Sequence, residues 1–336
     1  MITIAQIGAG AWGKNHLRNF HSFSGCKVKI CCDKNANVLK DISGNYKGEI
    51  KCTTDPSEIF ADKEIDGVVI ATLPDTHARL AIKALESGKH VFIEKPLAMS
   101  VKEGLEIKKA ALKNKNICMV GHILLYHPAV LMLKKYIDDG LLGDIYYLYS
   151  TRVNLGQIRE EENALWSLTS HDISVVLYLL GKFPYSVSAT GESYLRKNIH
   201  DVVFVNLCFK NNETAHIHAS WLDPHKIRQF TVVGSKKMAV FNDMEATEKL
   251  KIYDKGVDKT IDKNSYEAFL TLRSGDIFAP KIDIEEPLKR ECMNFLDCIR
   301  SNRKPLTDVD NGIEVLKILE AAQRSLDKGG ANVKVA

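Results

Sequence analysis

The chain has 336 residues, of which 45% are hydrophobic, and its 46 Lys and Arg residues nearly balance its 42 Asp and Glu residues. This length predicts two globular domains. The formal net charge of +4, without long runs of one sign, argues against a nucleic-acid or membrane-surface partner. The eight cysteines show neither a Cys-x-x-Cys pair nor metal-ligand spacing, which indicates reduced thiols and no bound metal.

We expect the first strand to begin at Ile2, which leaves no room for a signal peptide. No apolar stretch approaches the ~20 residues that cross a bilayer. We therefore expect a cytoplasmic protein.

The first 121 residues alternate short apolar runs with helical patterns. Runs without polar alternation, such as Gly67 to Ala71, are typical of a parallel sheet that helices cover on both faces. A helix over 75–87 ends at Gly88. The expected strands are 2–7, 27–32, 67–71, 89–93 and 117–120. Residues 1–121 are thus predicted to form a doubly wound Rossmann domain of the α/β class.

The segment Gly8-Ala9-Gly10-Ala11-Trp12-Gly13 lies between the first strand and a helix expected from Lys14. Its first glycine permits a tight turn, its second lets the backbone approach a pyrophosphate, and its third allows close helix packing. Asp33 ends the next apolar run, where a carboxylate accepts the adenine ribose hydroxyls of NAD, and Lys34 leaves NADP open. The expected cofactor contacts here are Gly8, Gly10, Ala11, Trp12, Gly13, Asp33 and Lys34.

Glu94-Lys95-Pro96 follows another expected strand, at the edge where doubly wound folds bind ligands. The Lys95 ammonium can hydrogen-bond a substrate hydroxyl and favour the alkoxide as hydride leaves, with Glu94 beside it. The alternative is a surface lysine on a turn. The glycine motif upstream favours the functional interpretation.

Residues 122–336 are expected to form a second α/β domain with a large, mostly antiparallel open sheet. Helices are expected over 128–139 and 166–180. The expected strands are 145–153, 186–192, 201–209, 214–221, 228–234 and 237–242. One sheet face needs a cover, so we expect a homodimer or homotetramer.

The stretch from Asp254 to Pro287 is polar and poorly periodic, so we expect a long loop that lines the cleft or reaches a neighbour. Two closing helices are expected over 288–301 and 311–328. These helices are candidates to pack back on the first domain.

His171 stands at the start of an apolar helix and is a candidate general base, because histidine accepts a proton near neutral pH. The alternative is a structural role at a helix start, since Ser170 and Asp172 are good capping residues. His122, Tyr126 and His127 lie at the expected domain junction, where clefts form. They are candidates for substrate binding or for interdomain packing.

Four segments carry a resemblance to the Gfo/Idh/MocA family of NAD(P)-dependent sugar and polyol oxidoreductases. They are 8–13, 72–77 (Thr-Leu-Pro-Asp-Thr-His), 84–98 (through Glu94-Lys95-Pro96) and 310–314 (Asp-Asn-Gly-Ile-Glu). The resemblance implies a Rossmann domain, a C-terminal α/β domain whose open sheet mediates dimers or tetramers, and a cofactor at the junction.

The resemblance also implies site roles. Lys95 corresponds to the family's catalytic lysine and His171 to its catalytic histidine, while Thr72, Pro74 and His77 line the cofactor. Many relatives carry an aspartate four residues before that histidine, where this chain has Ser167. Proton removal is therefore expected to rest on His171, with Lys95 assisting.

The segments 154–156, 159–166 and 171–174 are similar to enzymes that oxidise C3 of nucleotide-activated amino sugars. UDP-N-acetylglucosamine is the expected substrate, and an aminotransferase would act on its 3-keto product. UDP-N-acetylglucosaminuronate and inositol are the alternatives. The expected substrate contacts are His122, Tyr126, His127, Arg152, Asn154, Arg159, Asn163, Trp166 and His171.

A different class also fits the fold, because NAD(P)-binding regulatory proteins of this kind turn nothing over. Such a protein has no need for a lysine and a histidine beside the nicotinamide. Retention of both Lys95 and His171 favours the enzyme.

Overall fold

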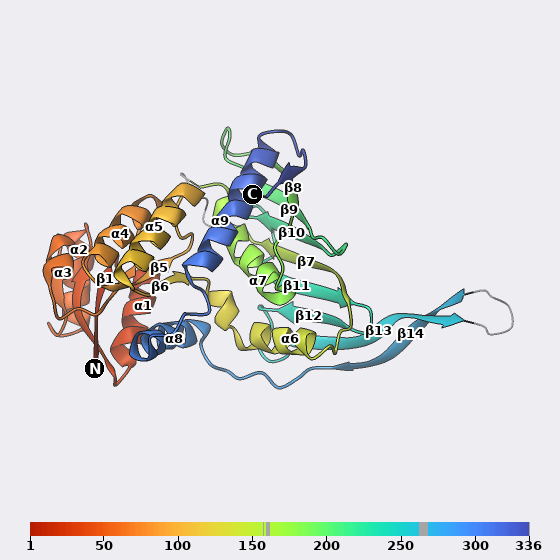
Figure 1. Ribbon diagram of the computed structural model, residues 1–336, viewed down its shortest axis with the longest axis horizontal. Helices are drawn as coiled ribbons and strands as arrows, with labels where there is room; N and C mark the ends of the chain where they lie inside the picture. Colours follow the sequence, from red (N-terminus) through yellow and green to blue (C-terminus); the bar gives the residue numbers. More distant parts are fainter. Residues whose placement is uncertain (157, 159–161, 262–267, 336) are drawn as a thin grey trace. The chain divides into compact units, whose positions relative to one another are not determined.

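The computed structural model describes residues 1–156, 158, 162–261 and 268–335. The chain divides into two compact units (Figure 1). The first comprises Met1–Tyr126 with Glu285–Leu316, and the second comprises His127–Ile284 with Lys317–Ala336.

The first unit holds a six-stranded parallel sheet in the order β3-β2-β1-β4-β5-β6. The strand order changes direction between β1 and β4, which is where doubly wound folds bind ligands. This confirms the expected Rossmann-type domain. The strands are β1 Ile2–Ile7, β2 Cys26–Cys32, β3 Lys51–Thr53, β4 Gly67–Ile70, β5 His90–Glu94 and β6 Cys118–Gly121.

Helices follow most of these strands. They are α1 Ala11–Ser22, α2 Ala36–Asn45, α3 Ser57–Ala61, α4 His77–Glu86 and α5 Val101–Asn114, with 3₁₀ turns η1 Pro74–Thr76 and η2 Ile123–Tyr126. A further helix, α8 Pro287–Ser301, comes from the far end of the chain and belongs to this unit.

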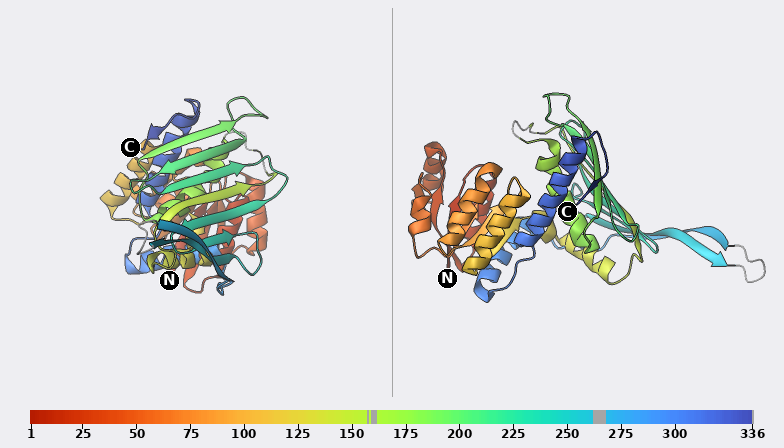
Figure 2. Two further views of the ribbon diagram at one scale, coloured as in Figure 1. Left: turned by 90° about the vertical axis from the view of Figure 1, so that its right-hand side faces the viewer. Right: turned by 45° about the horizontal axis from the view of Figure 1, so that its top comes forward.

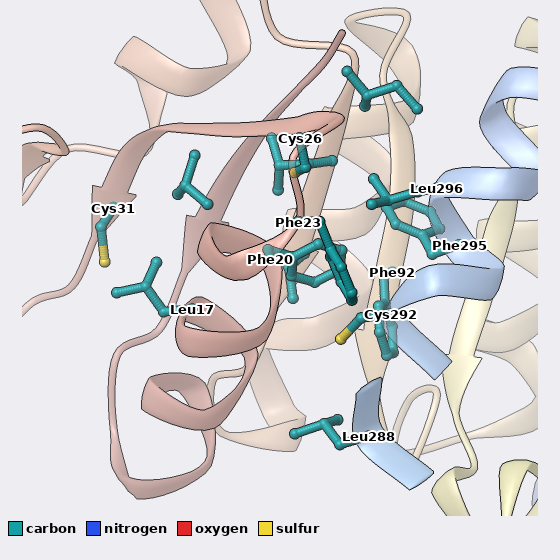
Figure 3. Packing of buried hydrophobic residues seen from close by; sticks show 14 of the residues in the cluster. Leu17, Phe20, Phe23, Cys26, Cys31, Phe92, Leu288, Cys292, Phe295 and Leu296 are labelled. Atoms are coloured by element: carbon teal, nitrogen blue, oxygen red, sulfur yellow. The ribbon is translucent and has the colours of Figure 1, made fainter. Parts of the chain in front are cut away.

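Aromatic packing joins α8 to the sheet and to α1. Phe295 of α8 lies 5.7 Å from Phe92 of β5 and 6.3 Å from Phe20 of α1, between ring centroids. Figure 3 shows these rings together with Cys292. Burial of such rings stabilises the unit by hydrophobic transfer and edge-to-face contact.

All eight cysteines are free thiols, and six of them are buried.

The second unit holds a nine-stranded sheet in the order β14-β13-β12-β11-β7-β10-β9-β8-β15. β10 runs parallel to β7 and the other pairs are antiparallel, so the expected mostly antiparallel sheet is confirmed. The strands are β7 Ile145–Val153, β8 Ser186–Glu192, β9 Val202–Cys208, β10 Thr214–Ser220, β11 Ile227–Gly234, β12 Met238–Asn242, β13 Leu250–Ile261, β14 Ala268–Phe278 and β15 Val333–Lys334.

Helices cover one face of this sheet. They are α6 Pro128–Asp138, α7 Ser170–Leu180 and the second half of α9 Val309–Leu326. On the face turned to the viewer in the left view of Figure 2, the described part of the unit places no helix. Rings gather on alternate residues of three neighbouring strands. Tyr147, Tyr149 and Phe204 are exposed, and His216 and His218 are partly exposed.

The expectation of a long loop from Asp254 to Pro287 is wrong for most of that stretch. β13 and β14 pair antiparallel as a long hairpin that extends beyond the neighbouring strands (Figure 1). Cross-strand backbone hydrogen bonds hold such a ribbon without a buried apolar face. Apolar periodicity in the sequence therefore did not predict these two strands. In the described part of the chain, no helix is both long enough and apolar enough to span a membrane.

Candidate cofactor and active-site residues

The glycine loop after β1 fits a pyrophosphate. Gly8 has φ +94°, and a Cβ there would lie 2.3 Å from the Ala71 carbonyl oxygen. A Cβ on Gly13 would lie 2.3 Å from the Gly8 carbonyl oxygen, whereas a Cβ on Gly10 would meet nothing within 4 Å. Gly8 and Gly13 therefore serve the turn and the packing, and Gly10 leaves open space above the loop.

The start of α1 is free to bind an anion. Gly10 offers no side-chain cap and the first turn carries no acidic residue, so its backbone N–H groups remain available. Gln6, fully buried, donates Nε2 to the carbonyl oxygens of Gly8 (2.8 Å) and Gly13 (2.7 Å). It braces the loop, and no motif in the sequence marked it.

Asp33 lies at the end of β2, as its motif position requires. Its Oδ2 accepts the Ala9 N–H at 2.7 Å and its Oδ1 accepts the Asn35 N–H at 2.8 Å. These two bonds orient the carboxylate beside the glycine loop. Lys34 next to it is exposed.

The Thr72 to His77 segment is tied to the Lys95-Pro96 segment. His77 is buried, with Nδ1 2.8 Å from the Pro96 carbonyl oxygen and Nε2 3.2 Å from that of Thr72. Burial lowers the pKa of His77, against the opposing effect of these hydrogen bonds. The His77 imidazole thus links two of the segments that carry the family resemblance. Pro74 lies in η1, between Thr72 and His77.

Glu94 and Lys95 end β5 at the carboxyl edge of the sheet. Glu94 is buried, while Lys95 is partly exposed and precedes a cis bond to Pro96. Glu94 Oε1 accepts from the Trp12 indole N–H and lies 2.6 Å from His16 Nε2, and Oε2 accepts the Lys95 backbone N–H at 3.1 Å. Sequence reasoning missed His16, which lies inside α1 without a motif.

The three candidates near residue 125 already have internal partners. His122 is buried with Nδ1 2.6 Å from Asn311 Oδ1, and burial lowers its pKa to about 4. The Tyr126 hydroxyl donates to Asn294 Oδ1 at 3.0 Å, and the His127 Nδ1 accepts the Ala129 N–H at 3.1 Å at the start of α6.

In the second unit, His171 lies in the first turn of α7, directly after a π-helix over Leu165–Thr169. Short π-helical segments are frequent at functional sites. The next residue, Asp172, pairs with Arg152 of β7 through Nε to Oδ2 at 2.6 Å and a second nitrogen to Oδ1 at 3.2 Å. This bidentate, mostly buried pair anchors the helix turn that carries His171.

Two other substrate candidates, Asn163 and Trp166, lie at the π-helix before α7. Asn163 accepts the Trp166 N–H at 3.2 Å and donates to Gln323 at 2.9 Å, so it already binds two partners. Trp166 and Asn154 are partly exposed. Arg159 lies outside the described residues.

Comparison with known proteins decides the family. Residues 2–122 match the oxidoreductase family with an NAD-binding Rossmann fold, and residues 130–240 match the GFO/IDH/MocA C-terminal domain. The chain belongs to the Gfo/Idh/MocA family. The expected NAD cofactor is therefore confirmed, and the first unit is the NAD-binding part of an oxidoreductase.

Relatives in the Gfo/Idh/MocA family span nearly the whole chain. The scyllo-inositol 2-dehydrogenase (NAD(+)) of Bacillus subtilis is 27% identical over 342 residues, which is 98% of this chain and 95% of that protein. Several other curated relatives align over about three fifths of their own length.

Two solved structures share the fold. The UDP-N-acetylglucosamine 3-dehydrogenase GnnA of Acidithiobacillus ferrooxidans superposes with a TM-score of 0.82 at 22% identity, covering 98% of each chain. Levoglucosan dehydrogenase in complex with NADH and L-sorbose superposes with a TM-score of 0.83 at 21% identity, covering 100% of this chain and 99% of that one.

Proposed function

We propose that this protein oxidises the C3 hydroxyl of UDP-N-acetylglucosamine to the ketone, with NAD⁺ as the hydride acceptor. The C–H and O–H bonds of the carbinol break, the hydride reduces NAD⁺, and the proton passes to the protein. The observation that carries the dehydrogenase assignment is Lys95, a partly exposed cation at the carboxyl end of β5 in an NAD-binding unit.

The proposal gives Lys95 and His171 separate chemical roles. The Lys95 ammonium hydrogen-bonds the substrate oxygen and stabilises its developing negative charge. His171 accepts the hydroxyl proton. NAD supplies the hydride acceptor when bound.

Position 167 holds Ser167 in place of the aspartate that many relatives carry. The helix turn that bears His171 is anchored by another residue. Asp172 is committed to Arg152 and fixes the backbone of the first turn of α7. Ser167 is buried in the π-helix. Proton acceptance is therefore assigned to His171 itself.

The amino-sugar substrate is supported by two observations. The segments around Asn154 and His171 resemble enzymes that act on C3 of such sugars, and GnnA shares the fold over the full length. Trp166 offers a flat apolar face for a sugar or uracil, and Asn154 an amide for a hydroxyl. The substrate roles of His122, Tyr126, His127, Arg152, Arg159 and Asn163 remain part of the proposal.

The inositol dehydrogenase relative supports a second candidate substrate, a cyclic polyol. The test mixes enzyme at substrate-like concentration with NAD⁺ and one candidate at a time, and records reduced nicotinamide by absorbance. UDP-N-acetylglucosamine should give a prompt rise that is absent in Lys95→Ala and His171→Ala, with NAD⁺ still bound. A rise only with the glucuronate form or with inositol would move the assignment to that substrate. No rise in absorbance with any of the three candidates would favour a regulatory protein.

We further propose a homodimer or homotetramer that forms through the ring-bearing face of the nine-stranded sheet. Exposed aromatic residues gathered on one sheet face are typical of subunit interfaces. An aminotransferase is the proposed consumer of the 3-keto product, because a ketone is the substrate of amino-group transfer.

A further inference from the structure

A buried chain of side chains runs from α8 through α1 to the end of β5. Cys292 Sγ lies 3.7 Å from His16 Nδ1, and His16 Nε2 lies 2.6 Å from Glu94 Oε1. Cys292 and His16 are fully buried. All three belong to the NAD-binding unit.

We propose that Glu94 is a fixed anion that makes this site favour NAD⁺ over NADH, and that its hydrogen bonds with Trp12, His16 and the Lys95 backbone keep the negative charge on it. The proposal rests on the NAD-binding role of the first unit and does not depend on which sugar or polyol is oxidised. Its consequence is that NADH is released after turnover.

The surroundings of Glu94 favour its ionised form. Its two oxygens accept hydrogen bonds from the Trp12 indole, from His16 and from the Lys95 backbone. Burial raises the pKa of Glu94, but the interactions with His16, Trp12 and Lys95 together bring the pKa below its ordinary value. Gly121 leaves the room that this carboxylate needs, since a Cβ there would lie 3.0 Å from Oε2.

Cys292 and Glu94 contact opposite nitrogens of the His16 ring. Burial raises the pKa of Cys292 well above its ordinary value, so the sulfur keeps its proton. The sulfur lies 3.7 Å from Nδ1, and the Glu94 carboxylate lies 2.6 Å from Nε2. These two contacts fix the orientation of the ring beside Glu94.

Glu291 adds no second charge to this region. It precedes Cys292 in α8, is fully buried, and neither carboxyl oxygen has a hydrogen-bond partner in the described part of the chain. Burial raises the pKa of Glu291 well above its ordinary value, so it is a neutral acid. Of the two buried carboxyl groups, Glu94 and Glu291, only Glu94 is then charged.

The strand order puts Glu94 on the side of the sheet that would face the nicotinamide half of a bound cofactor. Asp33 ends β2 and the glycine loop follows β1, so these residues would hold the adenosine and pyrophosphate. The rest of a dinucleotide would then extend toward β4 and β5, where Glu94 lies. The oxidised nicotinamide ring is positive and the reduced ring is neutral, so a buried carboxylate attracts NAD⁺ selectively.

The test measures the dissociation constants of NAD⁺ and NADH by calorimetry without any sugar, so a wrong substrate assignment does not affect it. Glu94→Gln should raise the ratio of the NAD⁺ constant to the NADH constant by about tenfold. Glu291→Gln is the matched control, because it makes the same change at a carboxyl that is already neutral, and its ratio should stay within about twofold of the wild-type ratio.

The proposal is overturned if Glu94→Gln raises the dissociation constants of NAD⁺ and NADH by the same factor, which is what a merely structural role predicts. Glu94→Asp keeps the charge and should keep the ratio even where both affinities fall. If Glu94→Gln does not fold, the test uses the two dissociation constants of the wild-type protein. It must bind NAD⁺ at least as tightly as NADH, and tighter binding of NADH by about tenfold or more overturns the proposal.

Discussion

At the scale of single residues, Gly8 and Gly10 differ in what a methyl group would meet. Gly8 has φ +94°, and a methyl group there would collide with the Ala71 carbonyl oxygen, whereas Gly10 faces open space. Gly8→Ala should therefore lower the free energy of unfolding by roughly 2 kcal/mol or more, while Gly10→Ala should change it by less than about 0.5 kcal/mol.

Urea denaturation measures both stabilities, and calorimetry measures NAD⁺ binding. Gly10→Ala should fold normally and bind NAD⁺ more weakly, because its methyl group fills the space above the loop. Equal stability of the two variants would contradict the account of Gly8.

His122 makes a prediction about pH. Burial holds the pKa of His122 at about 4 in the folded chain, below its ordinary value of 6.5, with the Asn311 hydrogen bond opposing this shift. The folded state thus binds fewer protons at His122 than the unfolded state does. The contribution of His122 to the free energy of unfolding is therefore fully present above pH 6.5 and is lost as the pH falls toward 4. Between neutral pH and about pH 4.5, His122→Gln should lose roughly 2 kcal/mol less stability than wild type.

Urea denaturation of both proteins at the two pH values measures this difference. Parallel losses in the two proteins would show that His122 does not titrate as stated.

Part of the residue-scale account was predictable from sequence. The glycine loop, Asp33 and Lys95 carry motifs that set their place at strand ends. Gln6 and His16 do not, because each acts through buried hydrogen-bonded contacts that form only when the chain folds. Their side chains lie inside elements whose sequence pattern shows only that they are a strand and a helix.

At the scale of elements, α8 belongs to the NAD-binding unit although it lies near the end of the chain. Phe295 is its fully buried anchor against Phe20 and Phe92. Phe295→Ala should lower the free energy of unfolding by about 3 to 5 kcal/mol, through lost burial and the cavity that remains.

Ile284→Ala is the control, because Ile284 is exposed and should change stability by less than about 0.5 kcal/mol. Denaturant titration followed by aromatic fluorescence compares the two. A loss below about 1 kcal/mol for Phe295→Ala would mean that α8 contributes little to this core.

Elements with a strong apolar pattern were predictable, and those held mainly by partners were not. The long strands and helices of the first unit show clear patterns, but the three-residue β3 does not. The β13–β14 hairpin exposes apolar side chains such as Leu270 and Leu272 instead of packing them on a core, and it is held by the pairing of its two strands and of β13 with β12. The π-helix before α7 was expected as ordinary helix, because a change of hydrogen-bond register leaves no mark on the apolar pattern.

At the scale of the whole molecule, the ring-bearing sheet face predicts how copies associate. Tyr149→Asp combined with Phe204→Asp places two charges among exposed rings of neighbouring strands. If this face is the proposed interface, the double variant should sediment as a smaller species than wild type, because buried charges disfavour association.

Leu112→Asp is the control, since Leu112 is equally an exposed apolar residue but lies on α5 of the first unit. It should leave the sedimentation behaviour unchanged. An unchanged mass for the double variant would place the subunit contact elsewhere.

The central claim is that the hydride leaves C3 of the sugar. The most direct measurement mixes the enzyme and NAD⁺ with UDP-N-acetylglucosamine that carries deuterium at C3, and follows the label by mass spectrometry over a single turnover. The account predicts deuterium in the reduced nicotinamide and a sugar that has lost it. Reduced nicotinamide without the label, or a sugar that keeps its deuterium while NADH forms, would contradict oxidation at C3.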